Sequence, residues 1–396
     1  MGAENYIVLR SVHDTLATVA DILTTSENEA LSFHWCQFSG QVKTSTGAPL
    51  QDSDVLQATY TLETSLDWVR NPPSSRRVYE AIQIAARRES THPVKEYLQA
   101  LKWDGVPRAN KLLSHYLGGC DSQLRRTQSA AFLVGAVARI FVPGSKVDVM
   151  PVLISAQGTG KSTAIRELSV VPEWFRDTPL DLRSKDCYEA IQGAWIVEIA
   201  EMRSIVSTSA ETVKAFLTSA IDSYRPAYGR CNVYRPRQCV FIGTSNDLQL
   251  TDTTGNRRYW PIPLESKPDL DAIRSDRDQL WAEAVVMFSR GDSWHLVAED
   301  DIAAASEEAG DFSTQDPWIS EICDYWNSQH LANRRPFETT ALLTYLGIDK
   351  RSQKQGDVMR VTRLMRGAGF TSKRKRDRDI RRTYWQGPTG HAGQAN

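Results

Sequence analysis

Short apolar runs bounded by turn residues predict buried strands in the middle of the chain. Stretches with helical spacing of apolar residues lie between these runs, at 161–168 and 211–219. Strands that alternate with helices predict a parallel α/β sheet covered on both faces. The predicted strands are 149–154 (VMPVLI), 195–199 (WIVEI), 239–243 (CVFIG) and 259–264 (YWPIPL).

The regions on either side show other patterns. Residues 1–70 mix short apolar runs with polar stretches and predict a small mixed region, whereas 71–145 has helical spacing. Three short helices near the end of the chain precede a basic arm, an order typical of a winged-helix domain. We therefore expect five parts: a mixed region at 1–70, a helical domain at 71–145, an α/β core at 146–300, a winged-helix-like domain at 316–386 and a disordered tail at 387–396.

Composition is that of a soluble globular protein. Of the 396 residues, 41% are hydrophobic and 24% charged. No apolar stretch is long enough to span a membrane, and the first residues lack the pattern of a secretory signal. Zinc sites and disulfide frameworks are not expected, because no CxxC pair occurs. Buried thiols in a reducing cytoplasm are predicted for the six scattered cysteines, Cys36, Cys120, Cys187, Cys231, Cys239 and Cys323.

Charge is unevenly distributed along the chain. The net charge of the whole sequence is −1, yet the segment Lys373–Arg382 contains seven basic and two acidic residues. Basic clusters of this kind bind nucleic-acid phosphates without reading base sequence. The residues expected to anchor duplex DNA are Lys373, Arg374, Lys375 and Arg376.

The loop between the first predicted core strand and its helix reads SAQGTGKST, Ser155–Thr163. A phosphate-binding loop (P-loop) requires small residues, a lysine for the β- and γ-phosphates and a hydroxyl for Mg²⁺. Lys161 and Ser162 supply the last two, and the sequence predicts binding of ATP with Mg²⁺. Ser155 departs from the usual pattern, which has Gly at this position. The residues expected to bind the nucleotide are Ser155, Gln157, Gly158, Thr159, Gly160, Lys161, Ser162 and Thr163.

A P-loop requires an acidic partner at the end of a neighbouring strand, to hold Mg²⁺ or to polarise the attacking water. Glu198 and Glu201 are the candidates, since both lie at or just beyond the second predicted strand. Strand alternation would point them to opposite faces, so that one acts on the nucleotide and the other is a solvated strand end. The sequence leaves this choice open.

Two further motifs follow the acidic pair. Asn246 ends the strand in CVFIGTSND, where its amide could orient water beside the γ-phosphate; the alternative is a turn-forming Asn. Arg257 and Arg258, in TGNRRYWP, either lie on the surface or reach the γ-phosphate of a neighbouring subunit as an arginine finger. Which arginine would do so is open.

Basic residues interleaved with tyrosines lie between the acidic motif and the Asn motif. This pattern suits a hairpin that follows a nucleic-acid backbone and stacks on its bases, and the alternative is a solvated charged loop. The candidate DNA-binding residues of this segment are Lys214, Arg225, Arg230, Arg235 and Arg237.

The order of these motifs resembles the superfamily III helicases of the AAA+ class. The chain also resembles the virulence-associated protein E family of phages and mobile genetic elements over about residues 92–264. The matching stretches are PVKEYLQALKWDGVPR, FLVGAVARIFVPGSKVD, LISAQGTGKST, WIVEIAEM, YRPAYGR, PRQCVFIGTSND and TGNRRYWPI.

The resemblance implies an ATP-dependent replication helicase or initiator that forms a ring, a homo-hexamer, in the cytoplasm of a bacterial host. It implies DNA, single-stranded or duplex, and host replication proteins as partners, and no membrane. Three alternatives remain: an initiator that uses ATP for assembly without unwinding, a P-loop kinase, and a catalytically inactive descendant, which Ser155 would suggest although every other ATPase element is present. A kinase would not account for the basic hairpin or the arginine pair.

Overall fold

The computed structural model describes most of the chain in two compact units. Unit 1 comprises residues 1–247 and 259–304, and unit 2 comprises 248–258 and 305–396. The structure describes residues 13–66, 68–69, 71–202, 208, 210–226, 231–248, 250, 258–312, 317–328, 336–377 and 380–387. Of these, residues 210, 317, 363, 367, 374–377 and 380–382 are described by their backbone alone.

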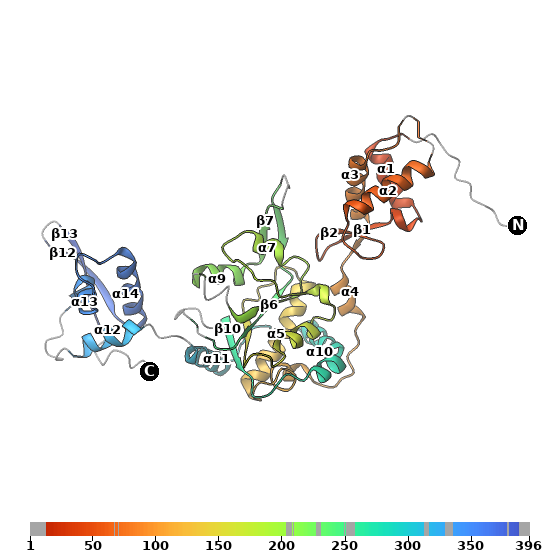
Figure 1. Ribbon diagram of the computed structural model, residues 1–396. Helices are drawn as coiled ribbons and strands as arrows, with labels where there is room; N and C mark the ends of the chain where they lie inside the picture. Colours follow the sequence, from red (N-terminus) through yellow and green to blue (C-terminus); the bar gives the residue numbers. More distant parts are fainter. Residues whose placement is uncertain are drawn as a thin grey trace. The chain divides into compact units, whose positions relative to one another are not determined.

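Unit 1 begins with a small subdomain in which three helices pack beside a three-stranded sheet (Figure 1). Its core includes Val19, Leu62 and Ile82, one from each helix, all fully buried. Because α3 shares this core, the subdomain continues past residue 70, where the sequence predicted a boundary, to about residue 91. Its elements are α1 (Leu16–Thr25), β1 (Phe33–Cys36), β2 (Gln41–Thr44), α2 (Asp52–Ser65), α3 (Ser75–Ala85) and β3 (Ser90–Thr91).

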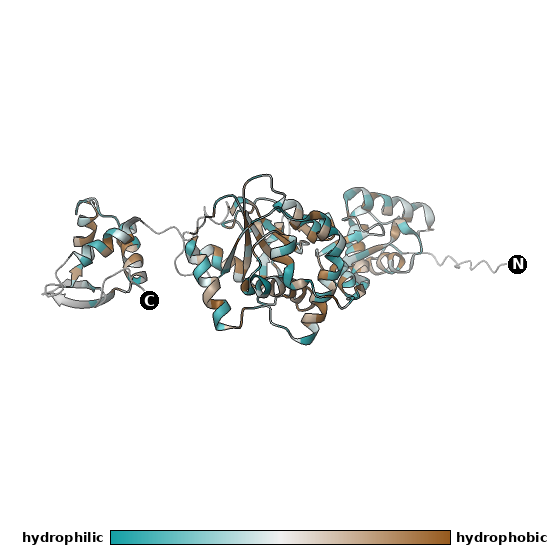
Figure 2. Cartoon of the chain, turned by 90° about the horizontal axis from the view of Figure 1, so that it is seen from below, coloured by the Kyte–Doolittle hydropathy of each residue, from teal (hydrophilic) through white to brown (hydrophobic). Residues whose placement is uncertain are grey.

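A helical layer follows and packs on the central sheet. The long helix α5 begins after Ser122, whose side chain accepts a hydrogen bond from the backbone N–H of Arg125. The helix α10 ends at Gly291 in the left-handed conformation, a common helix C-terminus. Hydrophobic residues of this layer belong to the same core as those of the central sheet. Figure 2 colours the ribbon by hydropathy, with hydrophobic residues in brown. Its helices are α4 (Pro93–Ala100), α5 (Gln123–Phe141) and α10 (Leu270–Arg290).

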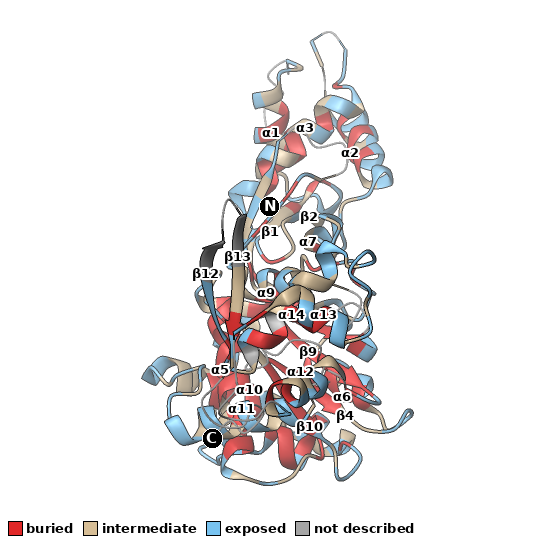
Figure 3. Ribbon diagram, turned by 90° about the vertical axis from the view of Figure 1, so that its left-hand side faces the viewer, coloured by how far each residue is buried: buried red, intermediate tan, exposed pale blue. Residues whose placement is uncertain are grey.

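The central sheet has five strands in the order β10-β4-β9-β6-β5, and all neighbours are parallel. This confirms the predicted parallel α/β sheet. Its strands are largely buried (Figure 3), as expected when helices cover both faces. The two-residue edge strand β5 was not predicted. The strands are β4 (Met150–Ile154), β5 (Phe175–Arg176), β6 (Ile196–Ile199), β9 (Val240–Ser245) and β10 (Tyr259–Pro263), and the helices between them α6 (Lys161–Leu168), α7 (Asp186–Ala190) and α9 (Ala210–Thr218).

An antiparallel hairpin lies between α9 and β9, formed by β7 (Ile221–Tyr224) and β8 (Val233–Pro236). Burial alternates along both strands, so that one face meets the protein and the other is exposed. Tyr234 is on the outer face and is 68% exposed, whereas Asp222 is buried.

Unit 2 contains three helices and a three-stranded antiparallel sheet around its own core. Trp326, Leu342, Met365 and Trp385 belong to this core and are almost fully buried. The strand order is β11-β13-β12, and β12 and β13 form a long hairpin. Its elements are α12 (Pro317–Asn327), β11 (Phe337–Glu338), α13 (Thr339–Tyr345), α14 (Gln355–Gly367), β12 (Thr371–Asp377) and β13 (Ile380–Gln386); α11 (Glu299–Asp311) crosses the boundary between the units.

Candidate nucleotide-binding site

The predicted phosphate loop connects the carboxyl end of β4 to the first residue of α6. Gly158 and Gly160 have φ values of 79° and 94°, a region that L side chains rarely adopt. A Cβ at either glycine would meet open space, so backbone conformation and not crowding requires glycine here. The loop lies at a helix N-terminus, where backbone N–H groups attract anions.

Lys161 folds back over the loop that precedes it. Its Nζ donates to the carbonyl oxygens of Ser155 and Ala156, at 2.7 and 3.1 Å, and to Ser155 Oγ at 3.1 Å. It also lies 3.4 Å from Asn246 Oδ1. Burial lowers the pKa of the Lys161 ammonium, and the nearby Glu198 carboxylate opposes this shift. The loop lysine and the predicted γ-phosphate sensor therefore face the same point.

Ser155, which replaces the usual glycine, bonds within the loop. Its Oγ lies 2.7 Å from Thr159 Oγ1, which in turn donates to the carbonyl oxygen of Ala156 at 3.2 Å. The two hydroxyls join the ends of the loop, so that serine at this position is compatible with the loop conformation.

Glu198 lies beneath the loop, at the end of β6. Ser162 Oγ and Thr244 Oγ1 both donate to Glu198 Oε1, each at 2.7 Å. The carboxylate is buried, and Glu198 Oε2 has no hydrogen-bond partner among the described residues. This brings together Lys161, Ser162, Glu198 and Asn246, four of the residues selected from the sequence.

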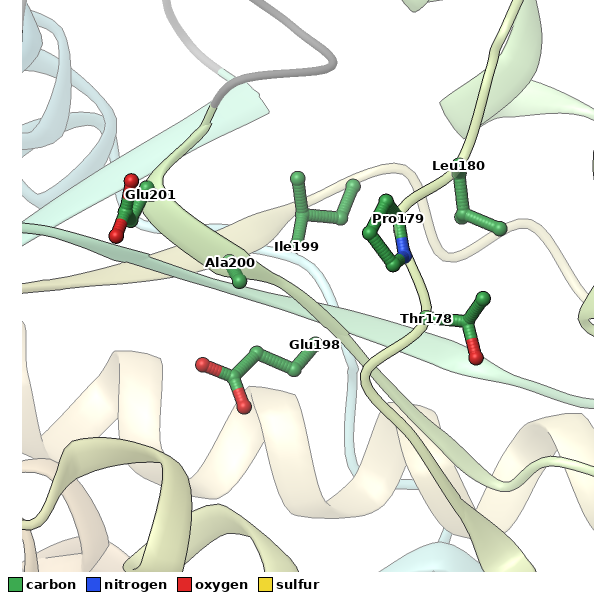
Figure 4. Close-up of a pocket in the computed structure, with 7 residues that line it drawn as sticks. All are labelled: Thr178, Pro179, Leu180, Glu198, Ile199, Ala200 and Glu201. Carbon is green, nitrogen blue, oxygen red and sulfur yellow. The ribbon is translucent and has the colours of Figure 1, made fainter.

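Glu201 takes a different position. It is exposed and lies in a tight turn after β6, with a φ of 51°. Figure 4 shows the carboxyl groups of Glu198 and Glu201 apart from each other along this segment. A Cβ at Gly243 would lie 2.8 Å from Met202 Sδ, so glycine in β9 allows the turn to pass closely. Because β6 ends at Ile199, the predicted strand alternation does not extend to Glu201.

A cavity of about 410 Å³ opens beside Lys161, Ser162 and Asn246. The predicted loop residues Gln157 to Thr163 line one side, and Thr244, Ser245 and Asn246 line another. Glu201 also lines this cavity, together with Ala200. A second, smaller cavity of about 150 Å³ lies between the β6 end and the segment Thr178–Leu180 (Figure 4).

Thr244 was missed by sequence reasoning, although it is buried against the acidic residue. The signal was present in the motif CVFIGTSND, since β9 extends two residues beyond the predicted end at Gly243. Alternation then places Thr244 on the same face of the sheet as Ile242, which pairs with Glu198 of β6. Asn246 lies just beyond the strand and is exposed.

The arginine pair is only partly described. Arg257 lies outside the described residues, and Arg258 directly precedes β10. The chain enters β10 at Tyr259, which pairs with Met150 at the start of β4. Since the two strands are parallel, Arg258 lies at the amino end of the sheet, whereas the loop that follows β4 lies at its carboxyl end.

The candidate DNA-binding residues of the core separate into three groups. Lys214 lies on α9 and is half-buried, and Arg225 follows β7 and is exposed. Arg230 lies outside the described residues. Arg235 and Arg237 turn inward.

Arg235 contacts the N-terminal subdomain. Its Nη2 donates to the carbonyl oxygen of Gly40 at 3.1 Å, and its guanidinium lies 5.4 Å from the centre of the Trp35 ring. The sequence predicted Arg235 as a DNA-binding residue and did not anticipate its contact with the N-terminal subdomain.

Arg237 is buried, so its assignment as an exposed DNA contact is corrected. Its guanidinium pairs with Asp222, and both side chains are almost fully excluded from solvent. The physical reason is the period of the strand: Val233, Arg235 and Arg237 lie on the side of the chain that faces the protein.

The basic arm of unit 2 forms the paired strands β12 and β13. Lys373 is exposed. Arg374, Lys375 and Arg376 pair through their backbones with Thr383, Arg382 and Arg381. Their side chains lie outside the described residues.

A family model for the virulence-associated protein E-like domain matches residues 98–313. The chain belongs to this family. The match confirms the resemblance recognised from the motifs, and the VapE-like domain spans α5, the central sheet and the whole candidate site. No curated protein matches the chain.

The chain also matches several solved structures. One is the apo structure of the NrS-1 C terminal region (305-718), with a TM-score of 0.42 and 14% sequence identity over 74% of this chain and 78% of that one. The A form apo structure of the same region has a TM-score of 0.43 at 14% identity, over 73% and 78% of the two chains. No helix in the described part of the protein is both long and apolar enough to cross a bilayer.

Proposed function

We propose that this VapE-like protein is a P-loop ATPase of the AAA+ type that hydrolyses ATP with Mg²⁺ and acts on DNA. The observation that carries the proposal is the convergence of Lys161, Ser162 and Asn246 at one cavity, at a glycine loop that precedes a helix, with Ser162 hydrogen-bonded to the buried carboxylate of Glu198. Loops of this kind hold the phosphates of nucleotides through backbone N–H groups.

In this proposal, each group at the cavity has one task. Lys161 exchanges its bonds to the loop carbonyls for the β- and γ-phosphates, which neutralise its charge better than neutral oxygens do. Asn246, already beside Lys161 Nζ, orients the attacking water near the γ-phosphate. The N–H groups of the loop and of the first turn of α6 stabilise the charge that develops on the phosphates.

The residues present fit a magnesium ion. Ser162 supplies a hydroxyl, and the buried Glu198 supplies a carboxylate oxygen that lacks a partner among the described residues. Mg²⁺ retains several waters and takes few protein ligands beside phosphate oxygens. When bound, Mg²⁺ would neutralise charge on the transferring phosphoryl group.

The proposed DNA partner and ring assembly rest on other features. Arg258 lies at the end of the sheet opposite the phosphate loop of the same subunit, a position that suits action on the nucleotide of a neighbouring subunit. We therefore propose a homo-hexamer in which neighbouring subunits share each ATP site. The three helices and basic hairpin of unit 2 support a winged-helix domain that anchors duplex. The expected function is that of a phage or mobile-element replication helicase.

An initiator that uses ATP only for assembly is the second candidate, and it shares the same site. One experiment separates the possibilities. ATP hydrolysis is measured with no DNA, single-stranded DNA and duplex DNA, with strand displacement and mass in solution measured on the same samples. Absence of hydrolysis in all three, together with absence of ATP binding, would reject the proposed function.

A further inference from the structure

The carboxylate of Glu198 receives two hydroxyl donors on the same oxygen. Ser162 donates from α6 and Thr244 donates from β9, so that Oε1 is bonded from two different elements while Oε2 is left without a described partner. Thr244 is only 4% exposed and Glu198 only 1%. Two bonds to one oxygen fix the rotation of the carboxylate, and they determine where its second oxygen points.

The two donors are not equivalent in the proposed reaction. Ser162 is the first residue after the loop lysine, and in the proposed function its hydroxyl turns toward the metal. Glu198 would then lose one of its two bonds. Thr244 stays in place, because its backbone is held between two strands: it pairs with Leu153 of β4, and the preceding residue, Gly243, pairs with Ile199 of β6.

We propose that Thr244 is a positioning residue, which holds Glu198 Oε1 in the metal-loaded state and thereby aims Oε2 at the metal or its water. This inference rests on the proposed nucleotide site and deepens it. The hydrogen bond from Thr244 is charge-assisted, so it is strong enough to determine the orientation of a buried carboxylate.

A purely structural role makes a different prediction. If Thr244 only satisfied a buried charge, its removal would destabilise the protein and weaken nucleotide binding equally with and without metal. A positioning role confines the defect to the metal-loaded state, because in the metal-free state Ser162 still bonds Glu198.

The test compares Thr244→Val, which keeps the shape and removes the hydroxyl, with Thr244→Ser, which keeps the hydroxyl. The dissociation constant of mant-ATP is measured by fluorescence, once in EDTA and once in excess Mg²⁺, on the full chain. Thr59→Val is the matched control, since Thr59 is a buried threonine of α2 whose hydroxyl donates to the carbonyl oxygen of Val55. Hydrolysis is followed in parallel to separate kcat from KM.

Thr244→Val is expected to bind mant-ATP as the unmodified protein does in EDTA, but about tenfold more weakly in Mg²⁺, with kcat reduced by at least the same factor. Thr244→Ser restores both, and Thr59→Val changes neither. Equal weakening in the two conditions, no weakening in either, or a Ser variant as impaired as Val overturns the positioning role while the ATPase assignment stands. If the unmodified protein binds no mant-ATP, the proposed function fails and the inference with it.

Discussion

Arg237 and Asp222 form an ion pair inside unit 1, with Arg237 Nη2 2.5 Å and Nε 3.0 Å from Asp222 Oδ1. Asp222 lies in β7 and Arg237 directly follows β8, so the pair closes the base of the hairpin. The guanidinium also lies 4.7 and 5.3 Å from the ring centres of Phe216 and Phe241, and it donates to the carbonyl oxygen of Phe216. The pair therefore fixes the hairpin to α9 and β9.

Removing one partner of this pair is expected to destabilise unit 1 strongly. Arg237→Ala leaves the Asp222 carboxylate buried without its partner, a change that costs about 3–5 kcal/mol. The control is Arg166→Ala, which breaks an exposed pair with Asp177 of similar length, 2.9 Å, and costs about 0–1 kcal/mol. Thermal and urea unfolding of both variants measure the difference. Equal melting temperatures for the two variants would contradict the anchoring role.

Much of this fold was predictable from hydrophobic patterning. The four predicted core strands overlap β4, β6, β9 and β10, because buried parallel strands are continuous apolar runs. The edge strand β5 has only two residues, too few for any period to be visible. The end of the N-terminal subdomain was also hidden, since α3 has the same helical spacing as the helices beyond it and only packing assigns it to the first core.

The candidate site was predictable as a set of residue types but not as a set of contacts. The sequence selected Glu198 and Glu201 equally, whereas the structure buries Glu198 and leaves Glu201 exposed in a tight turn. It treated Arg237 as a surface cation because single-sequence patterns do not reveal a partner 15 positions away, such as Asp222. For this reason the sequence does not show whether a charged residue in a strand is buried or exposed. Alternation shows which residues share a face of the strand, but not which face the rest of the protein covers.

The contact of Arg235 with the N-terminal subdomain predicts that Gly40→Ala destabilises the protein more than backbone strain alone would. A Cβ at Gly40 would overlap the Arg235 guanidinium, and Gly40 has a φ of 66°. Gly47 has a φ of 82° with open space around it, so Gly47→Ala is the matched control, with backbone strain of about 1 kcal/mol and no clash. We expect Gly40→Ala to destabilise the protein more than Gly47→Ala does, as measured by urea unfolding.

The clash can be isolated by a double variant. In an Arg235→Ala background, the cost of Gly40→Ala should fall to that of Gly47→Ala, because the guanidinium is gone. A cost of Gly40→Ala that is the same with and without Arg235 would show that the two residues do not touch in solution.

Lys161 is expected to be required for hydrolysis and dispensable for folding. Lys161→Ala removes the cation that is proposed to face the phosphates, and hydrolysis should fall by a factor of about 10³ or more, since electrostatic groups of this kind dominate phosphoryl transfer. Lys146→Ala, which removes an exposed lysine near Asp148, should retain full activity. Unfolding curves of both variants check the fold. Normal turnover by Lys161→Ala would reject the ATPase assignment.

The arginine pair makes a prediction about assembly. Arg257→Ala or Arg258→Ala should bind ATP normally and lose hydrolysis, because a finger acts on the nucleotide of the neighbouring subunit. Mixing the inactive finger variant with inactive Lys161→Ala should restore part of the activity, since some interfaces then combine an intact loop with an intact finger. The measurement is the hydrolysis rate over a range of mixing ratios under conditions of subunit exchange. No recovery at any ratio would count against shared sites.

The two basic elements are expected to contribute differently to DNA binding. The arm of unit 2 holds Lys373 and the three basic residues after it on one hairpin strand, separate in sequence from the cavity. Neutralising Lys373, Arg374, Lys375 and Arg376 should weaken duplex binding and reduce its salt slope by about 1 for each DNA phosphate that the arm no longer neutralises. Basal hydrolysis should be unchanged. The charge-matched control neutralises four basic residues of exposed ion pairs elsewhere, Arg76, Arg88, Arg126 and Lys146.

The hairpin of unit 1 should affect hydrolysis instead, because β7 and β8 lie in the chain between Glu198 and Asn246 and are anchored to β9 by Arg237. Arg225 and Arg230 are the residues to neutralise. Substitution of Arg235 or Arg237 would break their contacts with Gly40 and Asp222 and disturb unit 1. The double variant Arg225→Ala, Arg230→Ala should bind duplex with nearly the same affinity through the arm, yet lose DNA stimulation of hydrolysis. DNA titrations of ATPase rate and fluorescence anisotropy at several salt concentrations measure both quantities. If the arm variant lost basal hydrolysis while the hairpin variant kept full DNA stimulation, the two elements would have the opposite roles.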